Sequence, residues 1–153
     1  MSPRHFREIY FPAMRLECEI IHAAGKPVLF HSCGNNRLIL EMMIEAGMDC
    51  YQAIQPVERI EEIKALYGQR LALWGGVATS SLASASAEEI RQEVLFSLKH
   101  CAPGGGFILG SSHSLTVGTK PQNYRMMLET NRRCGGYPIS IPQQIPEPLW
   151  AMA

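Results

Sequence analysis

The chain has 153 residues, of which 46% are hydrophobic and 18% charged, and its 14 basic residues equal its 14 acidic ones in number. This length holds one domain with a sizeable core, and the balanced charge lacks the basic excess that nucleic-acid grooves and anionic membrane surfaces need. No apolar run approaches the roughly 20 residues that cross a bilayer, and the first twelve residues are polar with mixed charge, unlike a secretory signal, so we expect a cytoplasmic protein.

Apolar periodicity predicts a helix first and then four strand–helix units. Over residues 4–24 the apolar side chains recur three or four positions apart, with Pro12 inside this helix and Gly25 at its end. Short apolar strands follow at 28–33, 48–54, 70–77 and 106–113, and helices at 37–46, 57–67, 86–101 and 119–133. Asn35 and Asn36 can cap the first of these helices, and Gly47 is expected to end it. Ser86 and Glu89 have the spacing of a capping box at the start of the third of these helices.

Helical crossovers between all four strands predict a parallel sheet in an α/β fold. The strands are almost continuously apolar, which is typical of a sheet covered on both faces. No Gly-x-Gly-x-x-Gly follows the first strand, so a dinucleotide site is not indicated. A complete (β/α)8 barrel needs roughly 250 residues, and four units amount to half of one. Residues 136–153 are rich in proline and predict an extended tail or a docking strap.

The stretch VLFHSCGNN, at 28–36, predicts a metal site at a strand end. Residues two apart on a strand share a face, so Leu29, His31 and Cys33 are expected to point the same way. Imidazole and thiolate are good zinc ligands, and Gly34 allows a sharp turn over the site. The alternative interpretation is a core histidine beside a buried free cysteine.

His113, just past the fourth strand, is the candidate for a third ligand. Three protein ligands leave zinc one open position, which is the catalytic arrangement. The alternative is a loop histidine that hydrogen-bonds a ligand or the backbone. The five cysteines are odd in number and scattered, which favours a reducing compartment over a disulfide framework: Cys18, Cys33, Cys50, Cys101 and Cys134.

Other residues carry weaker indications. Gly75 at the end of the third strand permits close approach to a bound molecule, whereas Gly76 is expected in a tight turn with positive φ. Cys50 and Tyr51 are expected to line a pocket. The charged side chains of the second unit's helix are typical of a solvated face: Glu58, Arg59, Glu61, Glu62 and Lys64.

Taken in order, four stretches resemble the uroporphyrinogen decarboxylase superfamily, which includes the corrinoid-dependent methyltransferases related to methylcobamide:coenzyme M methyltransferase. They are GKPVLFHSCGN (25–35), IEAGMDCYQAIQPV (44–57), LALWGGVATSSL…SAEEIRQEV (71–94) and GGFILGSSHSLTVGTKPQNYRMMLE (105–129). The resemblance covers nearly all of residues 5–135. It implies that residues 1–135 form the C-terminal half of a TIM-type (β/α)8 barrel, a partial domain followed by the tail at 136–153.

The resemblance also implies a zinc site. The methyltransferase branch has His-x-Cys at this strand end and a later cysteine, which bind zinc; His31 and Cys33 match the first two, and His113 stands where the later cysteine is expected. The decarboxylase branch has no metal and carries Gly-His-Gly at the later position. The function implied is zinc-dependent methyl transfer from a corrinoid to a thiol or similar acceptor, with Asn35, Tyr51 and Gly75 as substrate-binding residues.

Two alternatives stay open. One is a uroporphyrinogen decarboxylase-type lyase acting on a tetrapyrrole, in porphyrin metabolism. The other is an inactive fragment or a structural subunit of a split barrel. A half-barrel leaves two open strand edges, each a template for pairing. We therefore expect a homodimer or a complementary N-terminal half-barrel as partner, with a corrinoid protein as a further partner.

Overall fold

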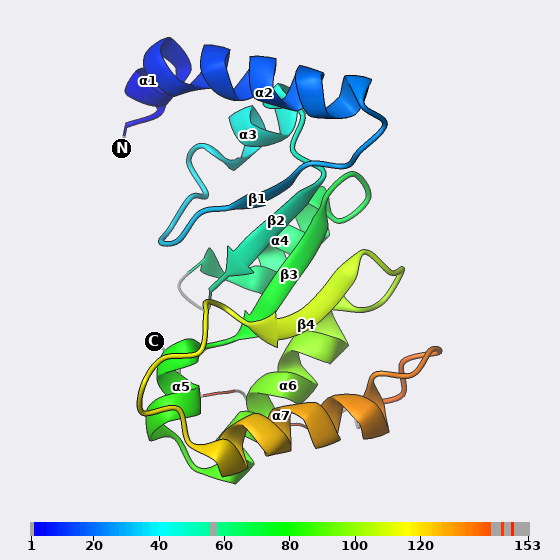
Figure 1. Ribbon diagram of the computed structural model, residues 1–153. Coiled ribbons are helices and arrows are strands. Elements are labelled where there is room, and N and C mark those ends of the chain that lie inside the picture. The colour runs from blue at the N-terminus through cyan, green and yellow to red at the C-terminus, as the bar shows by residue number, and fades with distance from the viewer. Residues whose placement is uncertain (1, 56–57, 142–144, 146–147, 149–153) are drawn as a thin grey trace.

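Four parallel strands form one sheet in the computed structural model, which describes residues 2–55, 58–141, 145 and 148. The strand order follows the chain, β1-β2-β3-β4 (Figure 1). Their bounds are Leu29–His31, Cys50–Ile54, Ala72–Val77 and Phe107–Ser111. The carboxyl ends of parallel strands all lie at the same end of a sheet. His31 and the segment after Ser111 therefore lie at that end.

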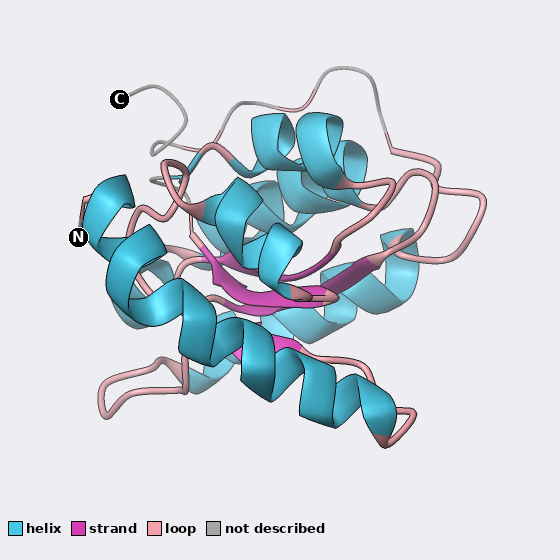
Figure 2. Ribbon diagram, turned by 90° about the horizontal axis from the view of Figure 1, so that it is seen from above, coloured by secondary structure: helices cyan, strands magenta, loops and turns pink. Residues whose placement is uncertain are grey.

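Helices connect the strands as predicted. In chain order they are α1 (Pro3–His5), the π-helical η1 (Phe6–Tyr10), α2 (Phe11–Ala23), α3 (Leu40–Ala46), α4 (Ile60–Tyr67), α5 (Thr79–Ser84), α6 (Ala87–Cys101) and α7 (Pro121–Cys134). In Figure 1, α2 and α3 lie beyond β1 at one edge of the sheet, and α7 lies beyond β4 at the other edge. The strands occupy the centre of the view from above, with helices around them (Figure 2).

The N-terminal helix is continuous from Pro3 to Ala23 but contains one π-helical stretch, η1, which ends two residues before Pro12. A proline has no N–H to donate to the carbonyl four residues earlier. Widening the preceding turn is one of the ways in which a helix accommodates that missing bond. The irregularity expected at Pro12 is therefore present, displaced by a few residues toward the N-terminus.

Helix α3 begins at Leu40, three residues later than the sequence pattern predicts. The predicted cap, Asn36, does not bond the first turn of that helix with its side chain, because its amide nitrogen faces the preceding loop instead. Gly47 ends α3 as predicted, with a φ of 115°. The predicted capping box is also confirmed, with the Ser86 hydroxyl accepting from the Glu89 N–H.

The two inner strands and the two outer ones differ in burial. β2 and β3 are largely buried, whereas β1 and β4 leave Leu29 and Ile108 about half exposed, at 50% and 49%. The prediction that both faces of all four strands are covered is therefore wrong for the two edges. A strand at the edge of a sheet has a neighbouring strand on one side, so its side chains are less covered than those of a central strand.

The helix predicted over 57–67 corresponds to α4, which runs from Ile60 to Tyr67, and its first predicted residue lies outside the described part of the chain. Of the proline-rich tail, the Tyr137 hydroxyl donates to the Ala102 carbonyl at 2.7 Å, and Ile139 and Ile141 pack on the core around α6 and α7. Within the described ranges no helix combines the length and the apolar character needed to cross a membrane.

Candidate metal centre

Three predicted ligands come together at the carboxyl end of the sheet. His31 ends β1, Cys33 follows two residues later, and His113 follows β4. Each offers one ligand atom, and the three atoms lie within 4.8 Å of one another. The imidazole rings of His31 and His113 are nearly perpendicular, with centroids 5.2 Å apart. All three side chains are exposed, so an ion can reach the cluster from solvent.

The His31–Cys33 pair is already close to a chelating geometry. The Cys33 Sγ lies 3.1 Å from His31 Nε2. On the other side of the ring, His31 Nδ1 makes a short hydrogen bond with the side-chain oxygen of Gln52, its register partner on β2. An amide oxygen only accepts, so this contact keeps the proton on Nδ1 and leaves the Nε2 lone pair facing Cys33. Metal-binding histidines are commonly oriented through their second nitrogen in this way.

His113 lies close enough to be a ligand, but the hydrogen bond of its ring favours the wrong tautomer for ligation through Nε2. The Ser114 N–H donates to His113 Nδ1 at 2.8 Å, so a neutral ring carries its proton on Nε2. To offer the Nε2 lone pair, His113 must give up that bond and move its proton to Nδ1. Zinc bonds of about 2.0 Å to nitrogen and 2.3 Å to sulfur place two tetrahedral nitrogen ligands about 3.3 Å apart, and a nitrogen and a sulfur about 3.5 Å apart. The separations of up to 4.8 Å therefore have to shrink by about 1.3–1.5 Å.

The donor set fits zinc by its chemistry. Two imidazoles and one thiolate are ligands of the type that zinc selects, and three protein ligands leave one position for another group. The segment carrying His113 is exposed from 113 to 118, so it can move the short distance required. The residues at this end of the sheet are thus able to hold a zinc ion.

The loop that carries Cys33 turns around Asn36, and we call residues 32–36 the ligand loop. Asn36 is buried, and its side-chain nitrogen lies 3.1–3.4 Å from three carbonyl oxygens of the loop. Behind it, the Tyr51 hydroxyl is 2.8 Å from the Glu58 carboxylate. Burial, and then the Glu58 charge, raise the pKa of Tyr51, and burial is also the main cause that raises the pKa of Glu58.

The three predicted substrate contacts have different surroundings. Asn35 is exposed, and its side-chain oxygen accepts from the Arg37 N–H. Tyr51 is fully buried behind the ligand loop and presents no surface to a substrate. Gly75 lies within β3, where a side-chain Cβ would meet the Ile54 carbonyl oxygen at 2.9 Å. The close approach at Gly75 is thus made by the neighbouring strand.

Gly76 has the predicted positive φ, 96°, but the prediction of a tight turn is wrong, because the residue pairs with Gly110 inside the sheet. A Cβ at Gly76 would meet the Ser97 hydroxyl at 2.8 Å, and that hydroxyl donates to the Gly76 carbonyl. The missing side chain therefore allows α6 to approach β3 closely.

Comparison with known proteins decides the family. The sequence profile of the uroporphyrinogen decarboxylase family matches residues 1–134. The chain belongs to the uroporphyrinogen decarboxylase family. A uroporphyrinogen decarboxylase from Saccharophagus degradans is 32% identical over 97 residues, which make up 63% of this chain and 27% of that protein.

A solved structure confirms the predicted fold. A methyltransferase from Methanosarcina mazei, a TIM barrel, superposes with a TM-score of 0.71 at 20% identity, over 89% of this chain and 39% of that one. At that identity the likeness concerns the fold alone. The chain spans about four tenths of the solved methyltransferase, so the parallel strand–helix units of this family member correspond to part of a barrel.

Sequence reasoning missed three residues around the candidate site. Gln52 is found only once the register of β1 and β2 is known. The sequence predicts Asn36 as a helix cap, but its side-chain nitrogen donates to carbonyl oxygens of the preceding loop instead. Glu58 was predicted on a solvated face, and this is wrong, because its side chain is 0% exposed. Its position beside the start of α4 turns it toward the ligand loop.

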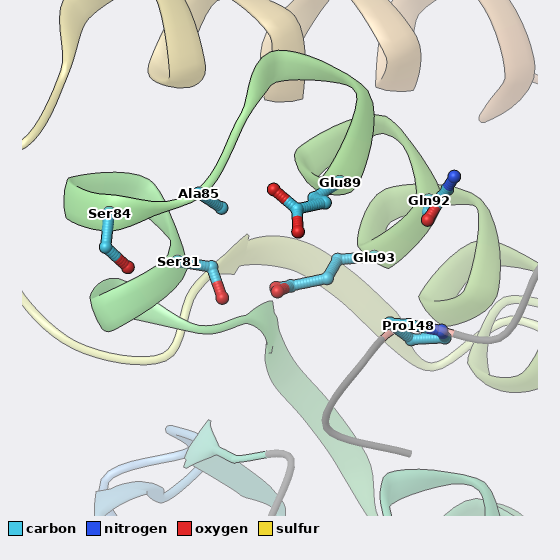
Figure 3. Close-up of a pocket in the computed structure, with 7 residues that line it drawn as sticks. All are labelled: Ser81, Ser84, Ala85, Glu89, Gln92, Glu93 and Pro148. Carbon is cyan, nitrogen blue, oxygen red and sulfur yellow. The ribbon is translucent and has the colours of Figure 1, made fainter. Parts of the chain in front are cut away.

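A separate cavity of about 300 Å³ lies where α5 and α6 meet, and none of the three candidate ligands lines it. Its walls include Ser81, Glu89, Glu93 and Pro148, and Figure 3 shows both carboxylates on one side of it. Glu93 is buried and accepts from the Ala78 N–H at 3.0 Å, while Glu89 belongs to the capping box of α6. Both carboxylates thus have structural partners in this family member.

Proposed function

We propose that this chain carries the metal-binding part of a zinc-dependent methyltransferase of the uroporphyrinogen decarboxylase family. The activity is transfer of a methyl group from a corrinoid, free or on a partner protein, to a thiol or similar acceptor. The observation that supports it is the cluster of His31, Cys33 and His113, with its ligand atoms within 4.8 Å. A cytoplasmic location is part of the proposal, and all five cysteines are free, as a reducing compartment requires.

In this proposal His31 Nε2, Cys33 Sγ and His113 are the protein ligands. Bound zinc supplies a Lewis acid that lowers the pKa of a coordinated thiol, so that it ionises near neutral pH. Gln52 holds the His31 ring and its proton in place. His113 would give up its backbone hydrogen bond from Ser114 to hold the ion, as the third ligand of the site.

The open edges of the sheet support the need for a partner. Among the described residues, β1 and β4 each pair with one strand, and each exposes a large apolar side chain, Leu29 and Ile108. The proposed partner is a complementary N-terminal half-barrel, and a second copy of this chain is the alternative. Either would pair with these edges and cover those side chains.

Decarboxylation of a tetrapyrrole is the second candidate. It is favoured by the sequence likeness to a uroporphyrinogen decarboxylase, 32% identical over 97 residues. A decarboxylase of that kind needs no metal at His31 and Cys33, so metal content separates the two candidates. A chain that binds neither a metal nor a porphyrin would favour a structural role in a split barrel.

Metal content of the purified chain tests the proposal. We expect about one zinc per chain, lost in His31→Ala and in Cys33→Ala. Cys134→Ala is the matched control, because that cysteine lies at the end of α7 and outside the cluster, and it should keep its zinc. A folded wild-type chain without zinc, or zinc that survives both ligand substitutions, would contradict the proposal.

A further inference from the structure

Glu58 is a buried carboxylate that receives three hydrogen bonds. Its Oε1 accepts from the Asn36 N–H at 3.0 Å and lies 2.8 Å from the Tyr51 hydroxyl, and its Oε2 accepts from the Gln55 N–H at 3.2 Å. The side chain is 0% exposed. The Arg37 guanidinium reaches the Glu58 backbone carbonyl, at 3.0 Å, rather than the carboxylate. Neutral donors thus satisfy the carboxylate oxygens.

Burying a carboxylate is costly even when it is well bonded, and an apolar side chain of similar size usually stabilises a core at least as well. A buried polar network whose members are all bonded, however, restricts the backbone to one arrangement. The position of Glu58 therefore points to a role in fixing a local conformation, and the segment it contacts is the ligand loop.

Asn36 transmits that constraint to Cys33. Its side-chain nitrogen lies 3.1 Å from the Ser32 carbonyl, 3.4 Å from that of Cys33 and 3.2 Å from that of Gly34. The same nitrogen is 2.7 Å from the Tyr51 oxygen, and the Ser32 hydroxyl donates to Asn36 Oδ1 at 3.2 Å. Three successive carbonyls are thus drawn inward around one amide, and the Cys33 side chain is left on the outside, where it is exposed.

We propose that Glu58 is a positioning residue which, through Asn36 and Tyr51, holds the ligand loop in the conformation that presents Cys33 to His31. The inference rests on the proposed metal site for its consequence but not for its geometry. Glu58 is not a ligand in this proposal, because it lies outside the cluster and its oxygens already accept from Asn36, Tyr51 and Gln55.

The first test needs no metal. Hydrogen exchange of the metal-free chain, followed by mass spectrometry, reports the opening of backbone amides in peptides that span the ligand loop. Glu58→Gln keeps the size of the side chain but removes one acceptor oxygen, so we expect amide exchange at least about tenfold faster in the ligand loop, with α7 unchanged. Glu41→Gln, an exposed acid on α3, should leave both regions as they are.

The second test is cobalt affinity, read from the thiolate-to-cobalt absorption band that reports a Cys33–metal bond. Loss of a residue that orients a ligand typically weakens metal binding by 10- to 100-fold, which is the range expected for Glu58→Gln. Tyr51→Phe removes only a hydroxyl and should give a smaller loss. If Glu58, Tyr51 and Asn36 act as one unit, the double variant Glu58→Gln/Tyr51→Phe will lose less cobalt affinity than the two single variants combined.

The outcomes separate the positioning role of Glu58, which we call the anchor, from the metal site. If the wild type binds no metal but Glu58→Gln still loosens the ligand loop alone, the proposed function fails and the anchor is supported. If metal binds but Glu58→Gln changes neither exchange in the loop nor cobalt affinity, the anchor is overturned and the metal site stands. Additive losses in the double variant would also overturn the anchor, since they would show independent effects.

Discussion

The two segments that supply the candidate ligands are built in opposite ways. The ligand loop after β1 surrounds a buried asparagine and is anchored from behind by Glu58 and Tyr51. The segment after β4, residues 112–118, has a buried serine at its start and then runs exposed to Gly118, with Val117 fully in solvent. Cys33 and His31 are therefore preorganised, whereas His113 has to move to join them.

This difference gives the site an order of assembly. A pair of ligands whose backbone is fixed loses little further backbone entropy when it binds an ion, and it forms the stable part of a chelate. A ligand on an exposed segment loses entropy on binding, but it can adapt to the length of the bonds. We therefore expect His31 and Cys33, after β1, to supply most of the metal affinity, and His113, after β4, to complete the site.

The largest expected effect breaks the preorganised half. His31→Ala or Cys33→Ala should raise the dissociation constant for cobalt or zinc by about a thousandfold or more, equivalent to about 4 kcal/mol. His113→Ala should cost less, about a hundredfold, because the entropy of ordering its segment offsets part of the bond it forms. Competition titration with a chelating indicator measures all three variants, and equal losses would remove the distinction between the two ends.

His113→Cys sharpens the comparison from the other side. A thiolate needs no exchange of ring tautomer and no release of the Ser114 bond, so we expect metal affinity about tenfold higher than in the wild type. Isothermal titration calorimetry under reducing conditions measures it. His113→Ser, which offers only a weak ligand, is the matched control and should behave like His113→Ala.

The anchored half should also show itself in the pH dependence of stability. Burial raises the pKa of Glu58 above its ordinary value of 4.5, so the folded chain binds this proton more tightly than the unfolded chain. The free energy of unfolding should therefore fall as pH rises from about 4.5 toward the raised pKa, and Glu58→Gln should lack that part of the slope. Urea unfolding at several pH values gives both curves, and parallel curves would contradict the account.

The smallest effect compares one glycine from each segment. Gly34 and Gly118 have φ of 88° and 100°, and a Cβ at either would meet no atom within 4 Å. In the ligand loop the backbone cannot relax, so Gly34→Ala should cost about 1 kcal/mol of stability and several-fold in metal affinity. Gly118→Ala should cost less in both, because its exposed segment can rearrange. Thermal unfolding with and without zinc measures the pair.

Local patterns were enough to predict the order of the elements and the end of the sheet at which the candidate ligands meet. The strand–helix alternation, the capping box at Ser86 and the glycine that ends α3 follow from neighbouring residues, and the structure has all three. His31 and Cys33 are two residues apart in the sequence, and His113 was found because it follows a strand. Parallel strands bring such ends together without further information.

The support around the ligands could not be predicted in the same way. Gln52 meets His31 only through the pairing of β1 with β2, which a strand's own sequence does not specify. Glu58 sits in a run of charged residues typical of a solvated helix face, and only its place just before α4 turns it inward. Alternation along β2 directs Tyr51 to the buried side, opposite Gln52. Its contact with Asn36, however, depends on how the ligand loop folds.

The central claim is that Cys33 and the two histidines share one ion. X-ray absorption at the zinc edge of the zinc-loaded chain measures the ligand atoms directly. The account predicts one sulfur at about 2.3 Å and two imidazole nitrogens at about 2.0 Å, with the sulfur lost in Cys33→Ala. A zinc shell of nitrogen and oxygen alone would contradict it, because Cys33 would then not be bound, and a shell with two sulfurs would contradict it, because the second cysteine would come from outside this cluster.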